Sequence, residues 1–164
     1  MLTLLRRNAL IVAACVMVGV AGGLGGYTFY YANGASYLSN DPAACVNCHV
    51  MREQYDGWQH ASHRIVATCN DCHVPHDSVA HKYFVKAEHG YRHSKGFTFQ
   101  DFHEPIQMKQ ASYDVVNDNC VRCHDAMTHD IRLAASGNHS SSQGVTGGVD
   151  CIRCHASVAH GPTR

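Results

Sequence analysis

A single uninterrupted apolar stretch dominates the amino-terminal part of the chain. Residues Ala9 to Ala32 contain no charged side chain, and a helix of about 20 apolar residues is long enough to cross a bilayer. Arg6 and Arg7 precede the stretch, and basic residues favour the cytoplasmic side of a membrane. Tyr30 and Tyr31 lie at its other end, where aromatic rings prefer the headgroup level. The pattern predicts one membrane-spanning helix whose amino end stays in the cytoplasm.

This prediction divides the chain into a cytoplasmic amino terminus at residues 1–8, an anchor at 9–32 and an exported domain at 33–164. Two other interpretations of the apolar stretch stay open. The first is a signal peptide that is cleaved near the small residues Ala21-Gly22-Gly23. The second is lipidation at Cys15, because the residues before it resemble a lipobox. Apolar residues continue well past Cys15, further than either processed signal requires, which favours a retained anchor.

The exported domain shows helical periodicity and no alternation of polar and apolar positions over the length of a strand. Three stretches are predicted to be helices, namely Met51–His63, His76–His93 and Glu104–Asn117. The segment Ser136–Gly148 is rich in glycine and serine and is predicted to be a loop. The fold class expected from this pattern is mainly α with extensive loops.

Four copies of Cys-x-x-Cys-His change this picture more than any other feature. They are Cys45-Val46-Asn47-Cys48-His49, Cys69-Asn70-Asp71-Cys72-His73, Cys120-Val121-Arg122-Cys123-His124 and Cys151-Ile152-Arg153-Cys154-His155. This pattern is the attachment signature of a c-type haem, in which two thiols bond to the porphyrin and the adjacent histidine lies under the iron. A zinc site does not need a histidine directly after the second cysteine. The sequence therefore predicts a multihaem cytochrome c with four covalently attached haems.

The motifs and the composition indicate the cellular compartment of the protein and argue against nucleic acid as a partner. Covalent haem attachment in bacteria takes place outside the cytoplasmic membrane, so we expect the anchor in the inner membrane and the haem domain in the periplasm. The chain has 13 Lys and Arg residues against 13 Asp and Glu residues, and it lacks a basic run that could neutralise nucleic-acid phosphates. Few long aliphatic side chains remain outside the anchor, so the porphyrins are expected to supply much of the apolar surface on which the domain folds.

The spacing of the motifs predicts which haems are neighbours. The motifs start at residues 45, 69, 120 and 151, so the intervals are 24, 51 and 31 residues. The short intervals make the first two haems neighbours, and likewise the last two. Four irons need up to eight axial ligands, and imidazole is the usual supply. Ten histidines lie outside the motifs: His60, His63, His76, His81, His89, His93, His103, His129, His139 and His160. At most four of them can be distal ligands.

The first motif differs from the others because Met51 follows its histidine, His49, by two residues. A thioether ligand stabilises ferrous iron and raises the reduction potential, whereas a methionine that only packs is the alternative interpretation. The motif begins only 13 residues beyond Ala32. Quinol is lipid-soluble, so its electrons must be accepted at the membrane. These features mark the first haem as the candidate site of quinol oxidation.

The order of these features resembles the NapC/NirT family of tetrahaem quinol dehydrogenases. One anchor helix is followed by Cys45-Val46-Asn47-Cys48-His49-Val50-Met51, by Ala67-Thr68-Cys69-Asn70-Asp71-Cys72-His73-Val74-Pro75-His76 and by two further motifs. A narrower resemblance, to the small membrane subunits of cytochrome c nitrite reductases, rests on Tyr55-x-x-Trp58, Lys86-Ala87 and His93 followed by Phe97-Thr98-Phe99. The resemblance covers nearly the whole chain.

The resemblance implies a set of iron ligands. Met51 is implied as the axial ligand of the first haem in place of His49. The other implied ligands are His73 with His160 at the second haem, His124 with His63 at the third, and His155 with a ligand from a partner subunit at the fourth. His60 competes with His63, because both flank Ala61-Ser62.

The resemblance also implies a quinol site that contains Lys86 and His93. The Lys86 ammonium can hydrogen-bond a quinol oxygen beside the first haem and assist its deprotonation. His93 stands where some relatives have an acidic residue, and an imidazole there can accept a quinol proton. The alternative is that His93 coordinates the first iron.

Three functions follow from this resemblance, and the first is favoured. The chain is expected to oxidise menaquinol and to pass electrons to a multihaem catalytic nitrite reductase subunit, with which it could form a larger oligomer. The second is a NapC-like quinol dehydrogenase that feeds a nitrate reductase or several periplasmic reductases. The third makes the chain itself the nitrite-reducing enzyme. The catalytic subunits have a haem bound by Cys-x-x-Cys-Lys, which is absent from this sequence.

Overall fold

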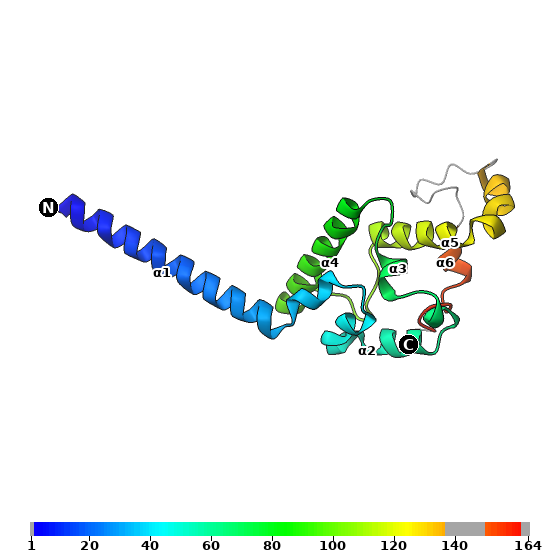
Figure 1. Cartoon of the computed structure of the whole chain (residues 1–164), viewed down its shortest axis with the longest axis horizontal. Helices are drawn as coiled ribbons and strands as arrows, with labels where there is room; N and C mark the ends of the chain where they lie inside the picture. Colours follow the sequence, from blue (N-terminus) through cyan, green and yellow to red (C-terminus); the bar gives the residue numbers. More distant parts are fainter. Residues whose placement is uncertain (1, 137–149, 162–164) are drawn as a thin grey trace. The chain divides into compact units, whose positions relative to one another are not determined.

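The computed structural model describes residues 2–136 and 150–161. Contacts divide the chain into two units, Met1–Ser36 and Tyr37–Arg164. Each unit consists of helices and connecting loops, and the described ranges contain no strand (Figure 1). The prediction of a mainly α-helical fold with extensive loops is confirmed.

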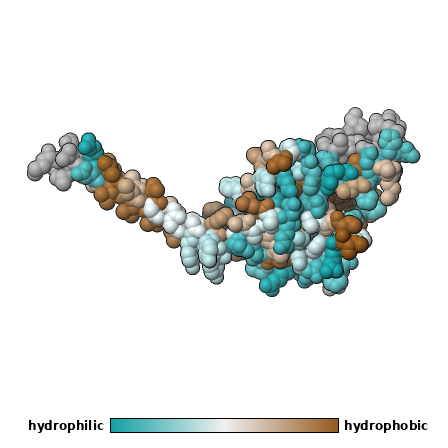
Figure 2. Space-filling model, in the orientation of Figure 1, coloured by the Kyte–Doolittle hydropathy of each residue, from teal (hydrophilic) through white to brown (hydrophobic). Residues whose placement is uncertain are grey.

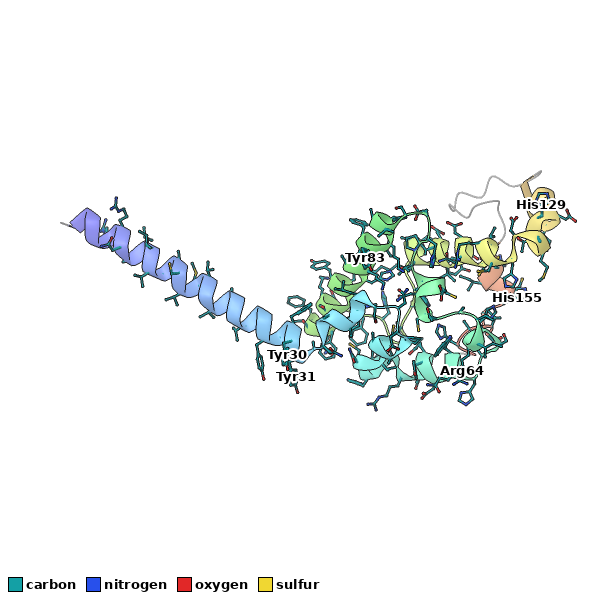
Figure 3. The ribbon with its side chains drawn as sticks, viewed as in Figure 1. Tyr30, Tyr31, Arg64, Tyr83, His129 and His155 are labelled. Atoms are coloured by element: carbon teal, nitrogen blue, oxygen red, sulfur yellow. The ribbon has the colours of Figure 1, made fainter. Side chains whose placement is uncertain are left out.

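The first unit is one long helix, α1, from Leu2 to Tyr31. Its segment Arg6–Tyr31 has 26 residues and a mean hydropathy of 2.1, which is long and apolar enough to cross a membrane. Figure 2 shows hydrophobic residues along the middle of this helix and residues of intermediate hydropathy toward its carboxyl end, where Tyr30 and Tyr31 project in Figure 3. A signal sequence of the same length and composition has the same properties.

The second unit begins with short helical elements. In chain order they are η1 (Gly34–Leu38), η2 (Pro42–Asn47), η3 (His49–Met51), α2 (Arg52–Gln59), η4 (Ser62–Ile65) and α3 (Cys69–His73). The helix predicted over Met51–His63 is therefore shorter than expected. The Trp58 indole donates to the carbonyl oxygen of Ala67 at 3.0 Å, and this bond holds the turn that follows α2.

The next helix, α4, spans Val79–Phe99. It starts three residues later than the predicted helix because Ser78 is its N-cap and accepts a hydrogen bond from the His81 N–H at 3.1 Å. It ends at Gln100, whose φ of 57° lies in the left-handed region.

The longest helix of the second unit, α5, spans Gln110–Ser136 and bends at His124, where φ is −108° and ψ is 23°. The predicted start at Glu104 is wrong, because Glu104 precedes Pro105 and a residue before proline disfavours the helical region. The predicted loop Ser136–Gly148 lies outside the described residues except for Ser136. The last described helix is α6, Cys151–Cys154.

The core of the second unit is small. The buried apolar side chains among the described residues are Ala44, Val74 and Val85. Two asparagines of α5 are also buried, Asn117 with 1% and Asn119 with 6% of its surface exposed. The principal helix–helix contact joins α3 to α5, so the second and third motifs share this core.

Candidate functional site

The first two motifs lie side by side. The thiols of Cys45 and Cys69 hydrogen-bond to each other, which lowers the pKa of Cys45 to about 7 and raises the pKa of Cys69. The Lys86 ammonium also lowers the pKa of Cys45. Two groups attached at these thiols would be near neighbours, as the short interval between the motifs predicts.

The series of neighbouring motifs continues through α3, α5 and α6. Cys72 of the second motif is close enough to Cys123 of the third for the two thiols to interact electrostatically. Cys120 interacts in the same way with Cys151 of the fourth motif. The four motifs therefore form one continuous series in the order of the sequence. The packing of α3 on α5 joins the second and third motifs across the 51-residue interval, which sequence spacing did not predict.

A capping box fixes the start of α3 and with it the second motif. The Thr68 N–H and hydroxyl both donate to Asp71 Oδ2, at 2.8 and 2.7 Å. Desolvation by itself raises the pKa of Asp71, but these hydrogen bonds reverse the effect and leave the pKa below its usual value. The carboxylate is thereby held in its ionised, accepting form.

The imidazoles of His73 and His160 face each other although they are far apart in sequence. Their ring centroids are 6.0 Å apart and their planes differ by 37°. The Nδ1 atom of His160 lies 2.8 Å from the carbonyl oxygen of Gln54, an arrangement that leaves Nε2 for another partner. Histidines that bind metals commonly donate their second ring N–H to a backbone carbonyl in this way.

Gly57 of α2 makes the approach of His160 possible. A Cβ atom at Gly57 would overlap the carbonyl group of His160. The segment that carries this histidine returns to α2 in Figure 1. A glycine in the middle of a helix destabilises the helix by about 1 kcal/mol relative to alanine. Glycine is nevertheless required at this position, because a Cβ atom would prevent the close approach of the His160 backbone.

The surroundings of His73 hold its imidazole in the neutral form that binds iron. Desolvation is the main cause that lowers the pKa of His73 to about 4, and the nearby imidazole of His160 contributes. His89 and His93 of α4 lower the pKa further. These two are one helical turn apart, with ring centroids 6.0 Å from each other. The structure thus places His93 near the second motif, together with His89, which was not predicted as a site residue.

A second pair of imidazoles joins η4 to the third motif. The ring centroids of His63 and His124 are 6.1 Å apart, with planes at 73°. The competing residue, His60, has its Nδ1 atom 2.8 Å from the carbonyl oxygen of Asp56 in the same helical turn. That bond resembles the one made by His160 and leaves Nε2 of His60 available. The ring contact with His124 is what distinguishes the two, because among the described residues His63, and not His60, lies against a motif histidine.

The histidine of the fourth motif, His155, follows α6 and is exposed. Figure 3 shows it at the surface of the second unit. The start of α6 is well fixed, because Asp150 Oδ1 accepts from the Arg153 N–H at 3.1 Å and from the Tyr113 hydroxyl at 2.6 Å. The residues described around His155 include no ring partner comparable to those of His73 and His124.

The first motif ends in η3, which contains both His49 and Met51. His49 is exposed and Met51 is half-buried. The two side chains therefore leave the same short helix, and the choice between them as the ligand of the first iron stays a prediction.

Lys86 lies beside the first motif and fastens the segment before it. Its Nζ donates to the carbonyl oxygen of Ser39 at 2.6 Å, with longer contacts to the Tyr37 and Leu38 carbonyls at 3.3 and 3.4 Å. Desolvation, and then the neighbouring Lys82, lower the pKa of Lys86. A quinol oxygen would have to replace one of the longer contacts, since an ammonium has three donors.

Sequence reasoning missed the two buried asparagines of α5. Asn119 Nδ2 donates to the carbonyl oxygens of Cys72 and Val74, both at 2.9 Å. Asn117 Oδ1 accepts from the Cys151 N–H at 3.0 Å. The only signal in the sequence is that both lie within three residues before Cys120, and such a position is also common for a surface residue.

The residues present fit c-type haems. Each metal–imidazole bond is about 2 Å long, so two rings that share one metal have centroids roughly 6 Å apart, the separation found for His73 with His160 and His63 with His124. A unit of this size with three buried apolar side chains among its described residues needs further apolar surface to be stable. Porphyrin faces supply such surface.

Comparison with known proteins agrees with this chemistry. Residues 6–164 match the sequence profile of the NapC/NirT cytochrome c family, N-terminal region. The chain is 36% identical over 161 residues to cytochrome c-type protein NrfH of Wolinella succinogenes, covering 97% of this chain and 90% of that protein. It is 32% identical over 139 residues to cytochrome c-type protein NapC of Haemophilus influenzae, covering 74% and 68% of the two chains.

A solved structure has a similar fold. It is the crystal structure of a cytochrome c nitrite reductase NrfHA complex bound to the HQNO inhibitor, of which one chain superposes with a TM-score of 0.60. The two chains are 23% identical, and the match covers 94% of this chain and 92% of that one. At this identity the likeness shows the fold alone.

Proposed function

This chain belongs to the NapC/NirT family of c-type cytochromes, and from that premise we propose that it is a membrane-anchored tetrahaem electron-transfer subunit. It oxidises menaquinol at the outer face of the bacterial inner membrane. It passes the electrons to a periplasmic catalytic subunit, resembling NrfA, that reduces nitrite to ammonium in anaerobic respiration. The chain is the quinol dehydrogenase of this complex and does not itself reduce nitrite.

The observation that carries the proposal is the continuous series of motifs from Cys45 to Cys151. The elements that carry successive motifs pack on each other at each step, first η2 with α3, then α3 with α5, and finally α5 with α6. An isolated redox enzyme needs one such site, whereas a series of sites suits electron transfer between two separate partners. The apolar helix α1 before the first motif supports a lipid-soluble donor at that end.

The chain's own residues would hold one haem at each motif. The eight motif cysteines would form the thioethers: Cys45, Cys48, Cys69, Cys72, Cys120, Cys123, Cys151 and Cys154. The proposed axial ligands are Met51 for the first iron, His73 with His160, His63 with His124, and His155 with a ligand from the partner. Bound haem supplies one-electron redox chemistry, and the ligands tune its potential.

The residues at the first motif would prepare quinol for oxidation. The Lys86 ammonium orients a quinol oxygen and favours loss of its proton, at a position near Cys45. His93, two helical turns further along the same helix and near the second motif, would receive a proton from quinol. Each menaquinol that becomes menaquinone gives up two protons and two electrons, so a proton acceptor must be available at this end of the chain.

The relatives support the nitrite reductase assignment over the alternative. NrfH of Wolinella succinogenes is 36% identical over 97% of this chain. NapC of Haemophilus influenzae is 32% identical over 74% of this chain, and NapC of Escherichia coli is 28% identical over 93%, which keeps a NapC-like role as the second candidate. Co-purification separates them, because a stable complex with a multihaem catalytic subunit supports nitrite reduction and transient binding to several acceptors supports the NapC-like role.

The proposal is tested with the haem-loaded full chain in detergent or vesicles. A menaquinol analogue should reduce its haems, and addition of the catalytic subunit with nitrite should reoxidise them and form ammonium. Nitrite alone should not reoxidise them at a comparable rate. Fast reoxidation by nitrite without the partner would instead support the nitrite-reducing interpretation.

A Lys86→Gln substitution should slow reduction by the menaquinol analogue by at least roughly tenfold, because an acid–base group at the reacting atoms contributes about 10²- to 10⁴-fold. Stopped-flow absorbance of the haem bands measures this rate. Reduction by dithionite should keep the wild-type rate, since it needs no quinol site.

The matched control is Lys82→Gln, one helical turn earlier on α4. This lysine has the same charge and contributes to the low pKa of Lys86, but it does not contact the Tyr37–Asn40 segment through any hydrogen bond found among the described residues. An equal decrease of the reduction rate in both variants would show that the Lys86 effect comes from the change in net charge. A wild-type reduction rate in Lys86→Gln would show that Lys86 is not part of the quinol site.

A Met51→Leu substitution should abolish the near-infrared charge-transfer band of a methionine-ligated haem and lower one of the four midpoint potentials. Leucine has a similar volume but no thioether, and a thioether ligand raises the potential. Near-infrared spectroscopy and a redox titration measure the two effects. Met108→Leu, at a methionine that is 41% exposed in another part of the chain, should change neither. A band that persists in Met51→Leu would mean that Met51 only packs.

A further inference from the structure

Two side chains next to Cys120 hold the backbone of the second motif. Asn119 Nδ2 donates to the carbonyl oxygens of Cys72 and Val74, both at 2.9 Å. Arg122 Nη2 donates to the carbonyl oxygen of Asp71 at 3.1 Å, and its Nε donates to Asn119 Oδ1 at 3.2 Å. We refer to Asn119, Arg122 and these three carbonyl groups as the α3–α5 clamp.

The clamp satisfies groups that would otherwise be costly to bury. Asn119 is 6% exposed and Val74 is 1% exposed, and a buried amide or carbonyl without a partner is strongly unfavourable. α3 has only five residues, so the carbonyl groups at its end cannot all be satisfied within the helix. Both N–H groups of one asparagine therefore fix the backbone on either side of His73.

Arg122 ties the clamp directly to the third motif. It lies between Cys120 and Cys123, the two cysteines of that motif. Its guanidinium thus spans from one attachment sequence to the backbone of another. A rotation of the third motif relative to α3 would break the bond to Asp71, and a shift of α3 would break the bonds to Asn119.

We propose that Asn119 and Arg122 are positioning residues that set the separation and orientation of the redox groups at the second and third motifs. Electron exchange between neighbouring groups depends steeply on both quantities. The proposal rests on haem attachment at these motifs, but it does not depend on which donor or acceptor serves the chain.

Asn117 provides a matched comparison two residues earlier on α5. It is 1% exposed, so its side chain is at least as well buried as that of Asn119. Its Oδ1 accepts from the Cys151 N–H at 3.0 Å, and its Nδ2 donates to the Tyr113 carbonyl at 3.3 Å. The two asparagines therefore share residue type, helix and burial but hold different motifs.

The test uses Asn119→Leu in the full haem-loaded chain, because leucine has a similar volume and lacks the amide donors. Photochemical reduction followed at the haem bands measures electron exchange within the chain, and electron paramagnetic resonance with a redox titration measures each site. We expect severalfold slower exchange, together with a shifted resonance and midpoint potential for one haem. Asn117→Leu should shift the resonance of a different haem.

Arg122→Met keeps the test decisive if Asn119→Leu fails to fold. Arg122 is exposed, so the variant should retain its haems, and it should shift the same resonance as Asn119→Leu by a smaller amount. Wild-type exchange rates and potentials in Arg122→Met and in any folded Asn119→Leu would overturn the proposal. The proposal would also be overturned if Asn117→Leu shifted the resonance and midpoint potential of the same haem as Asn119→Leu. Since the electrons come from a photoreductant, these results are independent of menaquinol and of nitrite reduction.

Discussion

A Gly57→Ala substitution should convert one haem of the isolated chain from low to high spin and remove about half of the low-spin signal, because only the second and third irons receive two ligands from this chain in the proposed set and one of them would lose a strong-field ligand. A Cβ at this position would overlap the carbonyl group of His160, so α2 could not receive the segment that carries this imidazole. The bond between His160 Nδ1 and the Gln54 carbonyl, 2.8 Å long, would be lost with it. The cysteines are untouched, so all haems should remain attached. Electron paramagnetic resonance and absorbance of the oxidised protein measure the change.

Gly90→Ala is the control for this substitution. Gly90 lies in α4, and no side chain or distant backbone atom is within 4 Å of a Cβ built there. Alanine favours a helix by up to about 1 kcal/mol over glycine, so the variant should keep the wild-type spectrum. His160→Ala should reproduce the loss seen in Gly57→Ala. A low-spin signal equal to that of the wild type in both variants would show that His160 is not an iron ligand.

A His63→Ala substitution should produce a loss of similar size at a different haem. The His63 ring is 6.1 Å from that of His124, and its removal leaves the iron of the third motif without its proposed distal ligand. We expect a new high-spin signal and a large rise in one midpoint potential, since axial ligation sets haem potentials over a range of about 0.8 V. Spectroelectrochemical titration of the haem-loaded chain measures both.

The neighbouring His60 offers a matched control for this substitution. His60→Ala removes the same side chain three residues earlier, where Nδ1 faces the Asp56 carbonyl at 2.8 Å. All four potentials should stay at their wild-type values. The opposite result, a high-spin signal in His60→Ala and none in His63→Ala, would assign the distal ligand to His60.

The sequence was informative where covalent chemistry depends on local spacing. Cys-x-x-Cys-His motifs report attachment directly, and the short interval between Cys45 and Cys69 predicted the neighbourhood that their thiols show. The helical fold followed from the absence of strand patterns and from the apolar stretch at α1. Element boundaries were less accurate where capping at Ser78 and the residue before Pro105 decided them.

Tertiary contacts between distant residues were beyond sequence reasoning. Nothing near Gly57 indicates that the backbone of His160 packs on it. Asn119 is one polar residue among several at the start of the third motif, and its two bonds to α3 arise only when the helices meet. A family resemblance proposed the pairing of His73 with His160, and the structure brings these rings together. Their role as ligands stays a prediction.

The two facing imidazole pairs, His63 with His124 and His73 with His160, are interleaved along the chain. Each loop closed by one pair contains one member of the other, so the sites are linked as overlapping loops and not as successive modules. A continuous fragment that covers only half of the second unit therefore cannot contain both members of both pairs. We therefore expect the sites to be completed together, only after the His160 segment is available to the rest of the unit, and we expect two-haem fragments of this unit to lack an independent fold.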